Sequence, residues 1–305
     1  MGADLRTAAA VAIAAIAVAL AAAGCGSGTA KCVGGTAAGN VVITNDAQLR
    51  QMVGCMHVKG HLTIMSPTAT RVDELESLTT VDGSVTIGPN AVLEDVSGLA
   101  NLRSVGSGEL VGGSGFGISY NPKLADATFP ALTFVAGELA IGGDGLTNVS
   151  FPALASVGGG LSVIDTTRLT TLSGLAGLIT IGGNLMIQGN AALTDTSGLS
   201  GLAAVPTDVL VSENPALTTL SLPSLGTVGA GQPSSTAVGP SSRQLYVSTN
   251  PALTTVNLPM LSFVGTGGVR FYDTPMLPQC AADAVAAAAG QSCNCSGNTG
   301  TAACN

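Results

Sequence analysis

Cysteine thiols are the side chains of this chain best suited to covalent or metal chemistry, and their spacing limits what they can do. All seven lie toward the two ends of the sequence, at Cys25, Cys32, Cys55, Cys280, Cys293, Cys295 and Cys304. A zinc site is one possibility. However, Cys293-Asn-Cys295 lacks the CxxC spacing of such sites, and His57 and His61 lie near the other end. We therefore expect disulfides, and no bound metal or other cofactor.

Cys25 differs from the other cysteines because it directly follows an apolar segment. Residues 7–24 are an almost unbroken run of Ala, Val, Ile and Leu after Arg6, long enough for a signal peptide or for an uncleaved anchor. The sequence Ala-Ala-Gly-Cys25 resembles the lipobox of bacterial lipoproteins, with alanine in place of the usual leucine. This resemblance implies a lipid on Cys25. The six remaining cysteines are then an even set, which suits disulfides in an oxidising compartment.

Carboxylates are the second group of side chains that could carry chemistry. The dense acidic clusters are Asp73-Glu74 and Glu94-Asp95. An enzyme that cleaves polysaccharides would gather such groups around one groove, and a β-helix enzyme of this kind is the alternative function. The residues indicate no Ser/His/Asp or Cys/His constellation. We therefore expect no enzymatic activity and assign no catalytic residue.

The elements that must position these residues come from a repeat of about 24 residues. Its strand segments alternate apolar and other residues, as in Leu185-Met-Ile187, which is the period of a short β-strand. A second apolar series advances in three-residue steps, as in Leu169, Leu172, Leu175 and Leu178, and favours a tight return path over an α-helix. The apolar anchors that count the repeats are Val58, Val81, Val105, Val135, Val157, Ile181, Val205, Val228 and Val264.

Stacking buries what a single repeat cannot, so the pattern predicts a mostly β solenoid of about nine short coils around a continuous aliphatic interior. Two Gly/Ser/Pro-rich insertions, at 107–117 and 229–243, are expected to be loops at one edge. Short helices at 45–53 and 280–289, stapled by cysteines, should cap the two ends. The predicted division is a signal peptide at 1–24, a lipid-anchored tether and start of the cap at 25–40, the solenoid at 41–279 and a Cys-rich cap at 280–305.

A polar residue recurs at one place in the coil. A side-chain amide repeated at an inward corner can satisfy backbone groups that no strand reaches, so we interpret this series as a structural ladder rather than a catalytic site. Thr166 and Thr274 replace the amide in two coils, each after an aspartate. The predicted ladder consists of Asn90, Asn121, Asp144, Asn190, Asn214 and Asn250.

The residue between the two inward anchors of each strand must point outward. Along the chain this position changes from small and polar to large and apolar or cationic, and the later members form a candidate interaction patch. The alternative is a strand surface covered by the 229–243 insertion. The predicted patch consists of Ile164, Met186, Gln188, Leu210, Tyr246, Arg270 and Tyr272.

The entry to the solenoid resembles a known family. The stretch Gly54-Cys55-Met-His-Val58-Lys-Gly60-His-Leu62-Thr-Ile64, after a short helix and an upstream cysteine, looks like the opening of receptor L domains. Later Leu-x-Ile-x-x-Asn-x-x-Leu units resemble both that family and leucine-rich repeats, so the likeness extends over about residues 32–280. It implies a right-handed β-helix or LRR-like solenoid that recognises a ligand outside the cell, with no catalytic residues to transfer.

The composition limits the classes of partner that the chain can bind. The chain has a net charge of −8 with only 9% charged residues, which opposes phosphate, so we expect no nucleic-acid binding. The combined expectation is an extracytoplasmic lipoprotein, tethered to the membrane, that recognises an unknown protein or glycan. If the organism has two membranes, Gly26 rather than aspartate after the lipid site resembles lipoproteins sorted outward, to the outer membrane or the cell surface. A purely structural surface protein remains a further alternative.

Overall fold

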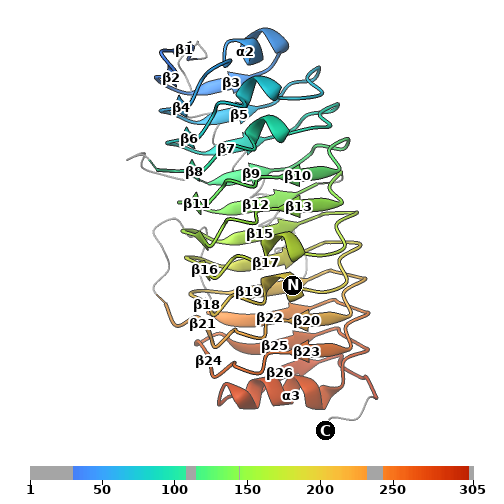
Figure 1. The fold of residues 1–305 in the computed structure, drawn as a ribbon. Coiled ribbons are helices and arrows are strands. Elements are labelled where there is room, and N and C mark those ends of the chain that lie inside the picture. The colour runs from blue at the N-terminus through green and yellow to red at the C-terminus, as the bar shows by residue number, and fades with distance from the viewer. Residues whose placement is uncertain (1–29, 108–114, 144, 232–242, 302–305) are drawn as a thin grey trace.

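The computed structural model describes residues 30–107, 115–143, 145–231 and 243–301 of the 305-residue chain. These residues wind into a tall stack of parallel strands, with the N-terminal coils at one end and the C-terminal coils at the other (Figure 1). Each strand pairs with its counterpart one repeat further along the chain. The predicted mostly β, solenoid-like fold is therefore confirmed.

The long sheet occupies the middle of Figure 1 and has eleven strands among the described residues. Its pairings are all parallel. Its strands are β3 (Val41–Ile43), β5 (Leu62–Ile64), β7 (Val85–Ile87), β9 (Phe116–Ile118), β12 (Leu139–Gly142), β15 (Leu161–Ile164), β17 (Leu185–Gln188), β19 (Val209–Ser212), β22 (Gln244–Ser248), β25 (Gly268–Tyr272) and β26 (Asn294–Ser296).

A second side of the stack is built from two-residue strands, each of which ends at one of the apolar anchors found in the sequence. The anchors are buried. These strands are β4 (His57–Val58), β6 (Thr80–Val81), β8 (Ser104–Val105), β11 (Phe134–Val135), β14 (Ser156–Val157), β16 (Thr180–Ile181), β18 (Ala204–Val205), β21 (Thr227–Val228) and β24 (Phe263–Val264). At the N-terminal end, β1 (Cys32–Val33) and β2 (Thr36–Ala37) extend this side as an antiparallel hairpin.

The third side is the return path. Leu169, Leu172, Leu175 and Leu178 are buried there and form no α-helix, as their three-residue spacing predicts. Some coils use a single 3₁₀ turn: η1 (Asp73–Leu75), η2 (Ser97–Leu99), η3 (Ser173–Leu175) and η4 (Ser197–Leu199). Others use a short strand: β10 (Asp126–Thr128), β13 (Asn148–Ser150), β20 (Thr219–Ser221) and β23 (Thr255–Asn257).

The core is one column shared by all coils. Leu161, Leu185 and Val209 are aligned in register on β15, β17 and β19, and all three are 0% exposed. A feature not expected from the repeat lies further toward the N-terminus, where the rings of Phe116, Phe129 and Phe151 pack together with centroids 4.8–5.6 Å apart. The aliphatic interior is thus interrupted by a local aromatic layer.

Both predicted helical caps are present. α2 (Asp46–Arg50) begins at Asn45, whose side chain accepts from the Gln48 backbone N–H, while Gln48 Oε1 accepts from Thr44 N–H at 2.7 Å. This reciprocal pairing fixes the start of the helix over the first coil. α3 (Gln279–Ala288) covers the other end (Figure 1). Among the described residues no helix has the length and hydrophobicity needed to span a bilayer.

The two insertions do not interrupt the stack. Residues 108–114 and 232–242 lie outside the described residues, yet β7 and β9 pair across the first insertion with Val85 opposite Phe116. Across the second, β19 and β22 pair with Val209 opposite Leu245. The insertions therefore leave the registers of the long sheet intact.

Candidate functional site

The outward face of the long sheet carries the candidate site. On strands β15 to β26, Ser162, Met186, Leu210, Tyr246, Arg270 and Asn294 follow one another in register. The residues on either side of each of them along the strand pack in or against the core. The sheet therefore aligns these side chains as a single file, one per coil, as expected from strand alternation.

Two tyrosines come together at the C-terminal part of this file. The rings of Tyr246 on β22 and Tyr272 on β25 lie with their centroids 6.0 Å apart and are tilted by 51°. Arg270, directly opposite Tyr246, donates through Nε to the Gly267 carbonyl at 3.0 Å. That bond constrains the orientation of the Arg270 guanidinium.

Two members of the predicted patch are not open to a partner. Ile164 is 2% exposed and Gln188 is 6% exposed, and Ile164 packs with Met186 in a small cluster apart from the main core. Their expected exposure was wrong, because outward strand positions beside large neighbours cover one another. Met186, Leu210, Tyr246, Arg270 and Tyr272 are partly exposed. We call these five residues the outer column.

Glu138 is a residue near this face that belongs to no motif of the repeat. It precedes β12, and its carboxylate accepts a hydrogen bond from the Ser162 hydroxyl on β15. Burial raises the pKa of the Glu138 carboxyl, and the Ser162 bond opposes that rise. The signal available in the sequence was an acidic residue placed directly before an apolar strand segment.

The asparagine series lies inside the stack, where its described members are buried. Asn90 donates to Asn121 Oδ1 at 2.8 Å, Asn190 donates to Asn214 Oδ1 at 3.0 Å, and Thr166 Oγ1 donates to Asn190 Oδ1 at 2.7 Å. Asp144 lies outside the described residues. The amides also donate to strand carbonyls, as Asn214 does to Ile187 at 3.0 Å. These contacts are those of a structural ladder.

The ladder is longer than the sequence indicated. Asn298 accepts from Thr274 Oγ1 and donates to the Phe271 carbonyl at 3.1 Å, so it occupies the same place one coil further on. At the other end, the Ser66 N–H donates to Asn90 Oδ1 at 2.6 Å. Asn298 follows Thr274 by 298 − 274 = 24 positions, and that repeat spacing could have revealed it.

Except at Asn90, which follows Pro89, the residue before each described ladder position from Asn121 to Asn298 adopts a left-handed backbone. Gly189 does so with φ of 70°, but Tyr120, Asp165, Glu213, Thr249 and Asp273 do so with side chains, at φ between 51° and 58°. Only glycine takes this conformation without steric cost. The corner that aims each ladder residue inward therefore imposes local strain.

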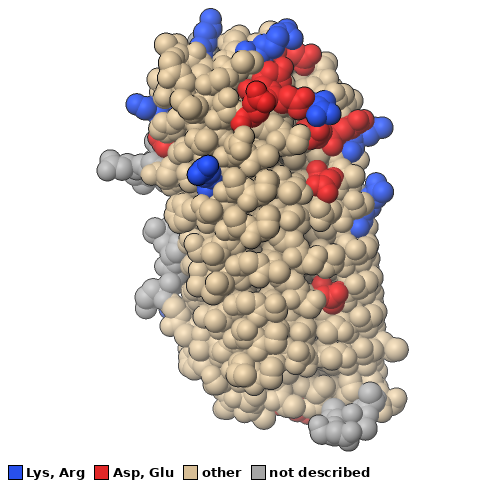
Figure 2. All heavy atoms as spheres, viewed as in Figure 1, with Lys and Arg blue, Asp and Glu red and all other residues tan. Residues whose placement is uncertain are grey.

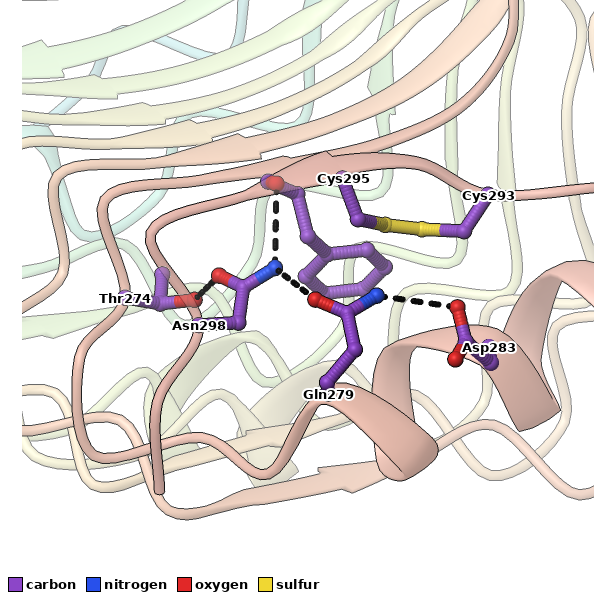
Figure 3. The surroundings of a disulfide bond; sticks show 7 residues. Thr274, Gln279, Asp283, Cys293, Cys295 and Asn298 are labelled. Atoms are coloured by element: carbon purple, nitrogen blue, oxygen red, sulfur yellow. Dashed lines mark hydrogen bonds between the residues drawn. A yellow bond between two sulfur atoms is a disulfide. The ribbon is translucent and has the colours of Figure 1, made fainter.

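At the C-terminal cap, Cys293 and Cys295 form a disulfide beside helix α3 (Figure 3). Cys280 is also disulfide-bonded, whereas Cys304 lies outside the described residues. Asp283 lies close to the two sulfurs, and the three potential ligand atoms are within 4.8 Å of one another. Because the sulfurs are bonded to each other, they offer no thiolate to a metal in this state.

The same cap is linked to the ladder through Gln279. Gln279 Nε2 donates to Asp283 Oδ1 at 2.9 Å, and Asn298 Nδ2 donates to Gln279 Oε1 at 3.4 Å (Figure 3). The helix is thereby connected to the last rung of the ladder. The contacts around this disulfide are those of a closing cap.

At the N-terminal cap, Cys32 and Cys55 are free thiols in the structure. Cys55 is buried, and its thiol donates to the His57 carbonyl at 3.6 Å. Burial, together with a hydrogen bond to Cys32, raises the pKa of Cys55 to about 12. The Cys32 side chain is thus one of the groups that act on the Cys55 thiol, and their predicted disulfide stays a prediction. Cys25 lies outside the described residues.

The acidic clusters of the alternative enzyme lie on the return path of the first coils. Figure 2 shows carboxylates gathered near the N-terminal end, with most of the rest of this face uncharged. Arg71 bridges them, with Nε 2.9 Å from Asp73 and Nη2 2.9 Å from Asp95. Asp95 also accepts from the Ser97 N–H at 2.7 Å, and that bond is the main reason why its pKa is lowered. Asp73 and Asp95 thus form ion pairs with Arg71, and Asp95 also stabilises a turn.

Comparison with known proteins agrees with the resemblance at the entry to the solenoid. A search of curated proteins found no match. The matching region of the family model ends at residue 143, directly after β12. It is therefore shorter than the region of about residues 32–280 that the repeats led us to expect. The coils beyond it continue the long sheet. Over residues 54–143, this chain is similar to the Receptor L domain.

Proposed function

We propose that this protein is a non-catalytic recognition module of the cell envelope, held on the extracytoplasmic side of a membrane by a lipid on Cys25. The match to the Receptor L domain favours ligand binding. The cysteine-terminated apolar segment favours export and lipidation. The ligand is a protein or a glycan.

The observation that carries the proposal is the outer column. Its apolar and aromatic side chains are stacked in register on one rigid sheet and remain partly exposed. Aromatic residues and arginine are enriched at protein interfaces, and tyrosine rings offer flat apolar area together with a hydroxyl. Strands hold such groups with more precision than loops do.

The test is a binding comparison between the chain and two variants. Tyr246→Ala with Arg270→Ala removes the centre of the outer column. Met260→Ala is the matched control, because Met260 is 65% exposed in the turn before β24, away from the long sheet. We expect pull-downs from envelope extracts or glycan arrays to lose their specific partner with the first variant only.

The same preparations address the two alternatives. Turnover of a polysaccharide by the unmodified chain would favour the enzyme, whereas saturable binding without turnover supports recognition. Capture of no partner by any variant would favour a purely structural surface protein. Intact-mass measurement of membrane-extracted protein reports separately whether Cys25 carries acyl chains.

A further inference from the structure

The N-terminal cap exposes three large apolar side chains to solvent. Val33 is 77% exposed, Val53 is 65% exposed and Met56 is 54% exposed. Buried positions were available to such residues throughout the solenoid, so exposed apolar side chains in the cap call for a partner. The last coils also expose Met260, Phe263 and Met276, and it is the charge and the entry point of the chain that distinguish the N-terminal end. We call Val33, Val53 and Met56 the cap tip.

The contacts of the cap place these residues at one end of the stack. Val33 belongs to β1, the outermost strand of its sheet. The Met56 N–H donates to the Gly35 carbonyl at 2.8 Å, in the turn that follows β1. The Cys32 and Cys55 side chains, which are next to Val33 and Met56 in sequence, hydrogen-bond to each other. Val33 and Met56 are therefore linked through the β1 turn, and Val53 precedes Met56 by three residues in the same cap.

Charge changes sign between the cap and the coil behind it. Residues 30–60 contain Lys31, Arg50 and Lys59 against Asp46, which gives 3 − 1 = +2. Residues 61–100 contain Arg71 against six carboxylates, which gives 1 − 6 = −5. In Figure 2 cationic side chains project from the N-terminal end, and carboxylates gather just below them. An anionic surface would attract the cationic residues 30–60 and repel the acidic residues 61–100, so it would orient the molecule with its N-terminal end toward that surface.

The start of the described chain lies at this same end. The Ala30 N–H donates to the Asn40 carbonyl at 3.0 Å, so the chain enters the structure beside the cap. The five steps from Cys25 to Ala30 span at most about 18 Å when fully extended. A lipid on Cys25 would therefore hold the cap within that distance of the bilayer surface.

We infer that the cap tip is a membrane-docking surface, which enters the interface of an anionic bilayer while Lys31, Arg50 and Lys59 contact the lipid phosphates. This inference rests on the proposed lipid anchor and adds to it an orientation: the solenoid stands on its N-terminal end. Shallow apolar insertion combined with cations is the way peripheral proteins supplement a lipid anchor. The C-terminal part of the outer column is then directed away from the membrane.

Native methionines report this orientation without any substitution. Met56 lies in the cap tip, whereas Met260 and Met276 are 65% and 56% exposed in the last coils. The full lipidated chain is treated with hydrogen peroxide in detergent, in phosphatidylcholine vesicles and in vesicles that also contain phosphatidylglycerol. Peptide mass spectrometry then gives the oxidation rate of each methionine, and intact mass gives the lipidation of Cys25.

We expect Met56 oxidation to slow by about threefold or more, relative to Met260 and Met276, in the anionic vesicles compared with detergent. Arg50→Glu with Lys59→Glu should restore the faster rate. An unchanged Met56 ratio on chains that carry the lipid would overturn the docking surface and leave the anchor standing. An unmodified Cys25 would instead refute the anchor, whatever the Met56 ratio.

Discussion

Nδ2 of Asn214 donates a 3.1 Å hydrogen bond to Oδ1 of Asn250, although 36 residues separate the two positions. The spacing is 24 between Asn190 and Asn214, and it is 31 between Asn90 and Asn121, which lie on either side of the first insertion. The extra residues between Asn214 and Asn250 belong to the 229–243 insertion, most of which lies outside the described residues, and the two side chains still meet. The ladder contact is therefore kept between neighbouring coils even where the number of residues in the repeat changes.

Removing one rung should be costly. In Asn214→Ala, the Ile187 carbonyl loses its side-chain donor and the Asn190 N–H loses its acceptor, both in the buried interior. Unpaired buried groups cost about 1–3 kcal/mol each, so we expect the free energy of unfolding to fall by roughly 3 kcal/mol. Chemical denaturation measures this change.

The matched control is Asn148→Ala. Asn148 also donates a side-chain bond, to Asp126 at 2.8 Å, but it is exposed on β13. Loss of an exposed bond should change stability by about 0.5 kcal/mol or less. If the two variants are equally stable, the ladder has no special role in holding the coils.

Thr249 offers the opposite test, because its substitution should stabilise the protein. It is an exposed β-branched residue with φ of 53°, at the corner before Asn250. Asparagine tolerates this conformation better, so Thr249→Asn should raise the free energy of unfolding by about 1 kcal/mol. Thr255→Asn, at an exposed extended position on β23, is the control and should give no gain. Equal effects at the two sites would contradict strain at the corner.

The sequence was a good guide where one physical requirement repeats in every coil. The anchors from Val58 to Val264 and the inward pairs such as Leu161 and Val163 had to be buried in the same way each time, so alternation and spacing located them. The outer file on the long sheet followed from the same alternation. These features depend on local geometry that a single coil already contains.

What depends on neighbours in space was not predictable from the pattern. The burial of Ile164 depends on contact with Met186 in the next coil, and the phenylalanine layer joins residues from different elements. The bond between Glu138 and Ser162 crosses coils as well. Each of these arises from pairings between side chains that the repeat does not specify.

Acid should weaken the N-terminal coils through His61. Its Nδ1 accepts from the Ser84 N–H at 2.9 Å, which requires the neutral ring, and burial lowers its pKa below the ordinary 6.5. Below pH 6.5 the unfolded chain binds the proton first, so the free energy of unfolding falls as pH decreases toward the folded pKa. Denaturation curves between neutral pH and that range measure the slope.

The variant His61→Gln separates this effect from other titrations. It removes the titrating ring while keeping a polar side chain at the position, so the part of the pH dependence due to His61 should disappear. A slope identical to that of the unmodified chain would mean that another group is responsible.

Oxidation should join Cys32 to Cys55. Cys32 already acts on the Cys55 thiol, and the bridge would close a loop of 55 − 32 = 23 residues around the capping helix. A loop of this length stabilises by about 3 kcal/mol, so Cys32→Ser should lower the stability of the oxidised protein by that amount. Peptide mapping without reduction should find the two residues linked.

In the reduced, folded protein Cys55 should resist alkylation. With a pKa of about 12, very little of its thiol is the reactive thiolate at pH 8, and the side chain is also buried. Iodoacetamide should therefore modify Cys55 quickly only after denaturation, and mass spectrometry of the peptide can follow the rate. Rapid modification in the folded state would show that the cap opens, in which case the helix over the first coil does not seal the core.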